Sequence, residues 1–408
     1  MAFVKHNFKD GDVLSASALN AIENQIALNE TNIASVSNNS GSSSDEKDWN
    51  FTADYQTEIN NVVKAIETIQ NNDKLHTVEF ITFSDMHRGS TTDHPEYDRM
   101  MNAINYLTHK LNIAFVANLG DNYTGYPTEG STYGKGVGIY EKLVDDLSEL
   151  NSPYININGN HDSVPHVYKR NWITNVPNAV FDSVGSWFYV DDHFHGVRFI
   201  VLDTQDYDGD ANKWTTVSNT GGYADRSYEQ LNWLANVALK TKNKIIFLQH
   251  QSMESTHSGT VHPTKPTSDN RYYIPKDIID SFEQGTAGSK AYDSNRTLNW
   301  DFTSQGTGTV LCNFCGHTHG DIFMSSNGTS VPSGFSSTIN EITVDDALYA
   351  TATHAGTGNT KTQNTVNEIA FDVVSVDLLN KVIKCHRFGT GNNRACTLGG
   401  SMTTFNYT

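Results

Sequence analysis

Five short apolar runs are the feature that most constrains how this chain can fold, because each of them ends in a polar segment. The runs are separated by helical or turn-rich stretches, a pattern typical of buried strands in an α/β sheet. They cover residues 78–83, 113–116, 154–157, 245–248 and 310–314. Such a sheet gathers its functional groups just beyond the carboxyl ends of its strands. We therefore expect the five polar segments to meet at one sheet edge.

The polar segments carry side chains that can bind metals or transfer protons. They are Ser-Asp-Met-His at 84–87, Gly-Asp-Asn at 120–122, Gly-Asn-His-Asp at 159–162, His250, and Gly-His-Thr-His at 316–319. Asp, Asn, Gly and His are also common turn residues at strand ends. All five segments in this order, each after an apolar run, favour a metal site over a set of ordinary turns.

In this order the segments resemble the calcineurin-like metallophosphoesterase family, over about residues 75–388. The resemblance implies a site for two metal ions. One ion would be held by Asp85, His87, Asp121 and His319, and the other by Asp121, Asn160, His250 and His317. Asp121 would bridge the two ions. His161 would be a catalytic residue that stabilises phosphoryl charge or protonates the departing alkoxide.

Two adjacent cations suit phosphoester hydrolysis, because they offset the charge of both the attacking and the leaving oxygen. Their joint charge also lowers the pKa of a shared water, so that hydroxide forms near neutral pH and becomes the expected nucleophile. Mixed nitrogen and oxygen ligands without a thiolate suit Mn, Fe, Zn or Ni. We take Mn as the working choice for assays.

Three further residues are candidates for supporting roles. Asn122 and Asp162 are predicted to accept hydrogen bonds from metal-bound imidazoles, with plain turn roles as the alternative. Arg88 directly follows the first ligand pair. It is a candidate for binding a substrate phosphate, with a solvated loop arginine as the alternative.

The composition narrows the choice of partners. The 408 residues carry a formal net charge of -18, which argues against long nucleic acid as a partner, because such binding depends on Lys and Arg. A phosphoester substrate remains compatible with that charge. The first residues lack the apolar core of a secretory signal, and no apolar stretch approaches the roughly 18 residues of a membrane span. Cys312 and Cys315 are interpreted as strand residues rather than metal ligands.

The chain divides into four predicted parts. Residues 1–40 form an attachment segment with a heptad helix, 41–52 a polar linker, 53–72 a second heptad helix, and 73–408 the enzyme domain with an insertion at 251–308. The second heptad helix is interpreted either as an oligomer stalk or as a helix packed on its own domain. The insertion is too long to be an idle loop and is expected to overhang the site.

The opening of the chain, residues 8–23, resembles the amino-terminal attachment segment of bacteriophage tail and baseplate proteins. That resemblance implies a virion component bound to other tail or baseplate proteins. The heptads would then assemble several copies of the chain, with a trimer favoured, and the enzyme would act outside the cell on the host surface.

The remaining patterns predict the fold class. Helices are expected at 95–111, 138–150 and 228–234, a hairpin at 187–202, and late strands at 369–376 and 381–385 that complete a second sheet. Together these elements predict an α/β fold in which helices flank a two-sheet β-sandwich, preceded by amino-terminal heptad helices.

The leading functional prediction is a dimetal phosphoesterase, with phosphodiesters preferred to monoesters, acting on bacterial surface polymers such as teichoic acid. Two alternatives stay open. The first is a tail protein that grips surface phosphate without turnover. The second is a cytoplasmic nuclease or nucleotide phosphatase of the same family.

Overall fold

A computed structural model describes most of the chain. The described residues are 49–88, 94–123, 133–162, 174–177, 179–181, 186–204, 206, 226–253, 256–257, 274–327, 330–331, 335–336, 339–348 and 359–407. The chain separates into two compact units, residues 1–50 and 51–408. The attachment segment, the first heptad helix and residues 41–48 of the linker lie outside the described residues. The fold below is that of the second unit.

One of the two large sheets, called the first sheet here, has seven strands. In spatial order they are β19 (Met402–Phe405), β18 (Asn393–Thr397), β17 (Val382–Gly389), β16 (Ala370–Asp377), β1 (Thr77–Phe83), β2 (Val116–Asn118) and β3 (Tyr154–Asn156). The strands β1, β2 and β3 are parallel. The carboxyl-terminal strands β16 to β19 extend the sheet antiparallel from the free edge of β1.

The other large sheet, called the second sheet, has eight strands. In spatial order they are β13 (Ser330–Val331), β12 (Phe323–Met324), β15 (Glu341–Thr343), β11 (Val310–Cys315), β7 (Lys244–Leu248), β6 (Val197–Val201), β5 (Phe188–Asp192) and β4 (Val180–Phe181). Its centre, from β15 to β6, is parallel. The strands β8 (Thr256–His257) and β14 (Phe335–Ser336) form a separate two-stranded sheet.

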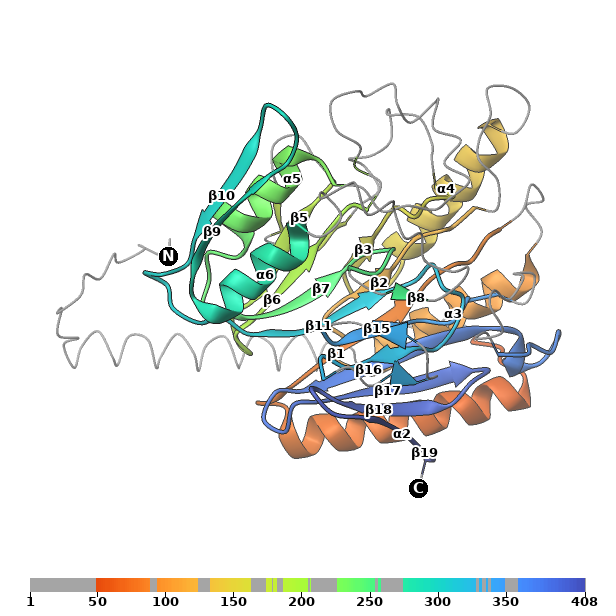
Figure 1. Ribbon diagram of the computed structural model, residues 1–408. Helices are drawn as coiled ribbons and strands as arrows, with labels where there is room; N and C mark the ends of the chain where they lie inside the picture. Colours follow the sequence, from red (N-terminus) through yellow and green to blue (C-terminus); the bar gives the residue numbers. More distant parts are fainter. Residues whose placement is uncertain are drawn as a thin grey trace, which may run out of the picture. The chain divides into compact units, whose positions relative to one another are not determined.

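The two sheets pack face to face through an apolar core with an aromatic centre (Figure 1). Phe80 of the first sheet meets Phe199 and Phe314 of the second edge-on, with ring centroids 5.8 and 5.2 Å apart. Phe115 lies 5.1 Å from Phe80 and 4.8 Å from Phe199. These four rings are fully or almost fully buried and set the spacing between the sheets.

Helices cover the outer face of each sheet, which gives four layers. The first sheet is covered by α2 (Ala53–Asp73), α3 (Pro95–Lys110) and α4 (Tyr133–Ser148). The second is covered by α5 (Tyr228–Trp233), the π-helical turn η2 (Leu234–Ala238), α6 (Ile274–Gln284) and the hairpin of β9 (Ala287–Ala291) and β10 (Thr297–Asp301). The helix-flanked two-sheet sandwich is confirmed. Within the described ranges no helix has the length and apolarity that a membrane crossing requires.

The second heptad helix, α2, packs on its own domain. Of the predicted apolar seam, Tyr55, Ile59, Val62 and Ile66 are 0–2 % exposed within the core that α2 shares with α3 and the first sheet, and Ile69 packs against that core partly buried. The Tyr55 hydroxyl also donates to Glu368, in the short helix η4 (Val366–Glu368), at 2.9 Å. Because the seam is already buried, it leaves no apolar stripe for a second copy, and a stalk role for residues 53–72 does not fit.

Several predicted boundaries are corrected. The run 113–116 leads into a strand assigned at Val116–Asn118, although Ala114 already donates to the Glu79 carbonyl at 2.8 Å. The helix predicted at 138–150 begins earlier, at Tyr133. The late strands join the first sheet rather than the second, because β16 pairs with β1 from Asp372 to Asp377.

The insertion at 251–308 is also corrected. Its described part does not form an overhanging loop, because α6 and the β9–β10 hairpin bury Ile278, Phe282, Leu298 and Trp300 against the second sheet's outer layer. Residues 254–255 and 258–273 of the insertion lie outside the described residues. Cys312 and Cys315 are buried in β11, as predicted.

His386 of β17 makes the stability of the fold depend on pH. Its ring is 3 % exposed, stacks on Tyr407 and meets Phe405 edge-on. Burial, assisted by Lys384, lowers the pKa of His386 from 6.5 to about 4. Because the folded state disfavours the proton, the stability present above the unfolded pKa is lost as pH falls from 6.5 towards 4.

The unfolding free energy of the wild type should fall as the pH is lowered from 7 to 5. We expect this fall to be about 2 kcal/mol smaller in the His386→Phe variant. Phenylalanine keeps the ring contacts and has no proton to bind. Urea unfolding of both proteins at the two pH values measures the difference. Equal losses in both proteins would show that His386 does not titrate as described.

Candidate metal centre

The predicted ligands come together where the two sheets meet at the carboxyl ends of their parallel strands. The site lies between two sheet ends rather than along a single edge, since β1, β2 and β3 belong to the first sheet and β7 and β11 to the second. Main-chain hydrogen bonds join the loops. Asp85 N–H donates to the Gly120 carbonyl at 2.8 Å, His87 N–H to the Asp121 carbonyl at 2.9 Å, and Gly316 N–H to the His250 carbonyl at 2.9 Å.

Two glycines in the sequence motifs allow this close approach. A Cβ on Gly159 would stand 2.1 Å from Asp121 Oδ1 and 2.4 Å from the Asp121 backbone nitrogen. A Cβ on Gly316 would stand 1.8 Å from Ser84 Oγ and 2.5 Å from Asp85 Oδ2. Both glycines are therefore required by contact between loops that are far apart in the sequence.

The backbone is strained at the ligands themselves. Of the seven described non-glycine residues with positive φ, five are predicted ligands: Asp85 (54°), His87 (42°), Asp121 (56°), His317 (69°) and His319 (52°). Left-handed backbone costs non-glycine residues of order 1–3 kcal/mol each, and it persists only where the surroundings enforce it. Because most of these strained residues are predicted ligands, the strain is best explained by the placement of their side chains.

The first cluster consists of Asp85, His87, Asp121 and His319, all buried, with one donor atom from each within 4.8 Å of the others. His87 Nε2 lies 3.0 Å from His319 Nε2 and 3.5 Å from Asp121 Oδ2. His319 Nε2 lies 3.3 Å from Asp85 Oδ1. Two ligand atoms that each stand about 2.1 Å from one ion lie about 3 Å apart, so this spacing fits a shared cation.

The second cluster consists of Asp121, His250 and His317, again with one donor atom from each within 4.8 Å of the others. His250 Nε2 lies 3.2 Å from Asp121 Oδ2 and 3.1 Å from Asn160 Oδ1. The ring centroids of His250 and His317 are 5.2 Å apart. Asn160 thus adds an amide oxygen to this cluster, and Asp121 is common to both clusters.

One backbone carbonyl fixes the tautomer of His250. Its Nδ1 lies 2.9 Å from the Leu119 carbonyl oxygen. A carbonyl only accepts hydrogen bonds, so Nδ1 carries the proton and donates it. The lone pair of neutral His250 is then on Nε2, the atom that faces Asp121 and Asn160. A hydrogen bond of this kind orients metal-binding histidines. It could not be predicted from the sequence, because its acceptor is a backbone atom.

The electrostatics of the site favour cations. Burial alone would raise the pKa of Asp85 and of Asp121, but His319 and His250 respectively outweigh it, so both pKa values lie well below the usual range. Burial alone would lower the pKa of His250, and Asp121 outweighs it, which raises that pKa to about 9. A cation bound here competes with protons for the same ligand atoms.

His161 stands beside the first cluster. Its backbone N–H donates to Asp121 Oδ1 at 2.7 Å, and its ring centroid lies 4.6 Å from that of His87. The residue is only partly buried, whereas His87 and His250 are buried. A partly exposed imidazole next to the first cluster is accessible to a substrate bound there.

Asp162 and Asn122 organise the ligand loops. Asp162 accepts hydrogen bonds from the backbone N–H groups of Asp121 (2.7 Å), Gly159 (2.8 Å) and Asn122 (2.8 Å), and from the Asn122 side chain (3.1 Å). These contacts tie the Gly-Asp-Asn loop to the Gly-Asn-His-Asp loop. They give both residues a supporting role through the backbone, which differs from the predicted acceptance from imidazoles.

Arg88 is buried against the helical layer. Its Nη2 donates to the Ile139 carbonyl at 2.7 Å, and its guanidinium lies 4.0 Å from the centre of the Tyr97 ring. Arg88 therefore packs on α3 and α4 and is not the solvated loop arginine given as the alternative. Its binding of a substrate phosphate stays a prediction.

A buried amide pair was missed by the sequence reasoning. Asn118 Nδ2 donates to Asn122 Oδ1 at 2.5 Å and to Asn156 Oδ1 at 2.7 Å, and Asn118 Oδ1 accepts from Gly120 N–H at 3.2 Å. Both Asn118 and Asn156 are the last residues of their strands, β2 and β3. Polar residues within otherwise apolar runs were the only available signal.

The residues present fit a pair of divalent cations. They offer buried carboxylate oxygens, an amide oxygen and imidazole nitrogens in two groups that share one carboxylate, and the tautomer of His250 is set for ligation. This donor set is compatible with several transition metals and does not select among them.

The sequence of this chain matches one known protein family. The family model of the calcineurin-like phosphoesterases matches residues 79–321, more than half of the chain. No curated protein matches the chain. Among solved structures 48 chains match, including one described as the structure of PhoD, with 10 % identity, 81 % of this chain and 72 % of that chain covered, and a TM-score of 0.42. On the match of the family model, this chain belongs to the calcineurin-like phosphoesterase family.

Proposed function

We propose that the chain hydrolyses phosphodiesters with two divalent cations held by its two clusters. Asp85, His87, Asp121 and His319 would hold one cation, and Asp121, Asn160, His250 and His317 the other. The observation that carries the proposal is that Asp121 belongs to both clusters. A carboxylate shared in this way keeps two cations close enough to act on one phosphoryl group.

The chain's own residues have separate tasks in this proposal. Bound cations would supply Lewis acidity and lower the pKa of a coordinated water. Asp121 and the buried histidines hold the ligand atoms in place, and the Leu119 carbonyl keeps Nε2 of His250 available. His161 stabilises phosphoryl charge or gives a proton to the leaving oxygen. Asp162 holds the Asp121 and Gly159 backbones in register.

The role of His161 gives the first test. We expect His161→Ala to hydrolyse bis-p-nitrophenyl phosphate in the presence of Mn²⁺ about 10²–10⁴ times more slowly than the wild type. Mn²⁺ stoichiometry, measured by calorimetry, should stay unchanged. The matched control is His109→Ala, since His109 lies on α3 with its ring bonded to the Asn105 carbonyl. Equal hydrolysis rates in all three proteins would end the catalytic assignment of His161.

The same assay separates hydrolysis from binding alone. A receptor-binding protein that grips phosphate through metal ions would bind Mn²⁺ without turning over either bis-p-nitrophenyl or p-nitrophenyl phosphate. The ratio of the two rates decides between diesterase and monoesterase activity. Turnover of neither ester, with Mn²⁺ bound, would favour the binding protein.

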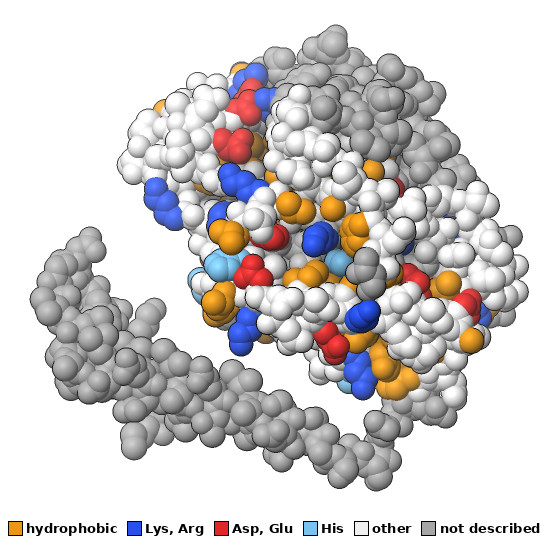
Figure 2. Space-filling model, turned by 90° about the horizontal axis from the view of Figure 1, so that it is seen from below, with side chains coloured by type: hydrophobic (Ala, Val, Ile, Leu, Met, Phe, Trp, Pro, Cys, Tyr) orange, Lys and Arg blue, Asp and Glu red, His pale blue; other side chains and the backbone are white. Residues whose placement is uncertain are grey.

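For the natural substrate we propose phosphodiester polymers of a bacterial surface, such as teichoic acid. The net charge of -18 disfavours long nucleic acid. On the face seen in Figure 2, basic and acidic side chains are interspersed rather than gathered into one basic patch. Release of phosphate-containing fragments from purified teichoic acid, compared with DNA and nucleotides, tests the substrate. Faster cleavage of DNA would favour the nuclease alternative.

The virion location and the trimer remain predictions. The second heptad seam is buried in the domain, so both predictions rest on residues 8–23 and the first heptad helix. Those residues lie outside the described part of the chain. The mass of the full chain in solution tests the assembly, and a monomer would overturn it.

A further inference from the structure

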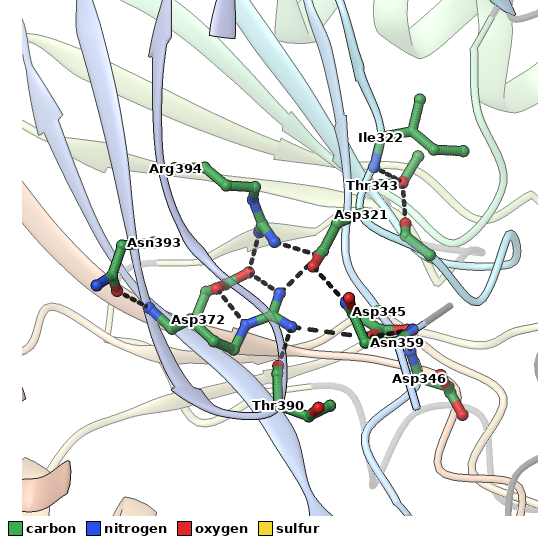
Figure 3. A network of polar contacts seen from close by, with 12 residues as sticks. Asp321, Ile322, Thr343, Asp345, Asp346, Asn359, Asp372, Thr390, Asn393 and Arg394 are labelled. Carbon is green, nitrogen blue, oxygen red and sulfur yellow. Dashed lines mark hydrogen bonds and ion pairs between the residues drawn. The ribbon is translucent and has the colours of Figure 1, made fainter. Parts of the chain in front are cut away.

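Two buried arginines of the carboxyl-terminal strands hold the residue that follows the last ligand loop. Arg387 of β17 and Arg394 of β18 are each 2 % exposed. Arg387 Nη2 donates to Asp321 Oδ1 at 2.6 Å, and Arg394 Nη1 forms an ion pair with the same oxygen. Figure 3 shows the Asp321 carboxylate pointing toward Arg394. Asp321 is two residues beyond His319.

The ligand loop that ends at Asp321 needs such an anchor. His317 and His319 both have left-handed backbone, which surroundings must enforce. At its start the loop is held by the Gly316 N–H bond to the His250 carbonyl and by the His317 N–H bond to Asp85 Oδ2, at 2.9 and 2.8 Å. At its end, Thr343 Oγ1 bonds the Gly320 carbonyl and accepts from Ile322 N–H at 2.9 Å. The two arginines complete this second anchor.

The arginines are themselves fixed by Asp372 of β16, which is fully buried. Arg387 Nε donates to Asp372 Oδ1 at 2.9 Å, and Arg394 Nη2 donates to Asp372 Oδ2 at 2.5 Å. Each guanidinium therefore spans Asp372 in the first sheet and Asp321 at the ligand loop. Because β16, β17 and β18 are adjacent strands, the loop end is tied to the middle of the first sheet.

The same network also reaches the Asp85 loop. Asn359 Nδ2 donates to Asp321 Oδ2 at 3.0 Å and to Asp345 Oδ2 at 2.8 Å. Asp346, the residue after Asp345, forms an isolated parallel β-bridge with Ser84. The N–H of Ala347 donates to the Ser84 carbonyl at 2.9 Å. The network thus contacts the chain beside Asp85 as well as the chain beyond His319. These are two ligands of the same cluster.

A contribution to stability does not explain such a network. Taking two arginines and two aspartates out of water costs several kcal/mol per ion, and well-packed apolar residues are often at least as stabilising. Ion pairs with bidentate geometry do, however, fix relative positions sharply. The network therefore suits placement of the loop better than stability of the fold.

We propose that Arg387 and Arg394 are positioning residues, which act through Asp321 to hold His317 and His319 at the metal site. Both arginines lie outside residues 79–321, the span of the family match. The inference rests on the proposed function only for the identity of the ions. The position of the loop is a property of the chain itself.

The test compares Arg394→Met and Asp321→Asn with the matched control Arg198→Met. Arg198 is another buried arginine with a bidentate ion pair, to Asp191, at the opposite end of the parallel strands. Mn²⁺ affinity is measured by calorimetry on the full chain. Hydrogen exchange is measured for the amides of residues 316–322, in buffer with chelator.

We expect Mn²⁺ to bind about 10–100 times more weakly to both test variants, as is typical when partners of metal ligands are removed. The amides of residues 316–322 should exchange at least about tenfold faster, and the control should match the wild type in both measurements. Asp321→Asn is the milder change and decides the matter if Arg394→Met does not fold.

Unchanged affinity and unchanged exchange in a folded Asp321→Asn protein would overturn the proposal, as would equal losses in Arg198→Met. Failure of the wild type to bind Mn²⁺ would instead contradict the proposed function. In that case the exchange of residues 316–322 still decides whether the arginines position the loop.

Discussion

The Asp121→Asn variant is expected to lose hydrolysis by at least about 10³-fold, because the substitution affects both clusters of the site. Asp121 is the residue common to both clusters. Metal ions supply several kcal/mol of charge stabilisation in such reactions, and each 1.36 kcal/mol corresponds to a factor of ten in rate. Weakening the bridge affects both ions at once, so Mn²⁺ stoichiometry should also fall.

Asparagine is the suitable replacement because it isolates the charge. It tolerates the left-handed backbone found at position 121, and its side-chain oxygen can still accept from His161 N–H. The measurements are the rate with bis-p-nitrophenyl phosphate and the Mn²⁺ content, with Asp293→Asn, an exposed turn carboxylate, as control. Two bound Mn²⁺ ions and a rate within tenfold of the wild type would refute the bridging role.

The Gly159→Ala variant should also show a large effect, with hydrolysis slower by about 10²-fold or more. The added Cβ would stand 2.1 Å from Asp121 Oδ1 and 2.4 Å from the Asp121 backbone nitrogen. Because one of these atoms belongs to the backbone, rotation of a side chain cannot relieve the clash. The two ligand loops must move apart, and misplacement of reacting groups by about 1 Å is enough for such a loss.

A second glycine provides the control for this experiment. Gly138 lies in α4, and a Cβ there meets nothing within 4 Å. Gly138→Ala should leave hydrolysis unchanged and raise the unfolding free energy by roughly 0.5–1 kcal/mol, because alanine favours a helix. Rates and urea unfolding are measured for both variants. Wild-type activity in Gly159→Ala would show that the loops need not approach so closely.

Much of the fold could be predicted because strands and helices leave periodic patterns. The runs at 78–83, 154–157, 245–248 and 310–314 are strands within one or two residues at each end. The partition of strands between sheets could not be predicted in this way. Whether β16 pairs with β1 depends on contacts nearly 300 residues apart in the chain, and these contacts leave no local signal.

The candidate site also combines residues that local motifs predict with contacts that leave no local signal. Asp85, Asp121 and His319 were recognisable because ligand residues stand in short motifs after strands, and the structure brings them together. The Leu119 carbonyl and the Arg387–Asp321 contact were not recognisable, since one is a backbone atom and the other joins residues 66 positions apart. The heptad spacing of α2 allowed two readings, because an apolar stripe does not specify its partner.

The aromatic centre between the sheets has a consequence for catalysis. Asp121 and Asp85 are carried by the first sheet, and His250 and His319 by the second. The fit of these ligands to one another therefore depends on how the two sheets are held together, and Phe80, Phe199 and Phe314 are part of the core that holds them. Trimming one of these rings would be expected to shift the ligands of the second sheet relative to those of the first, although no ring contacts a ligand. The aromatic core far from the loops therefore contributes to the geometry of the candidate site.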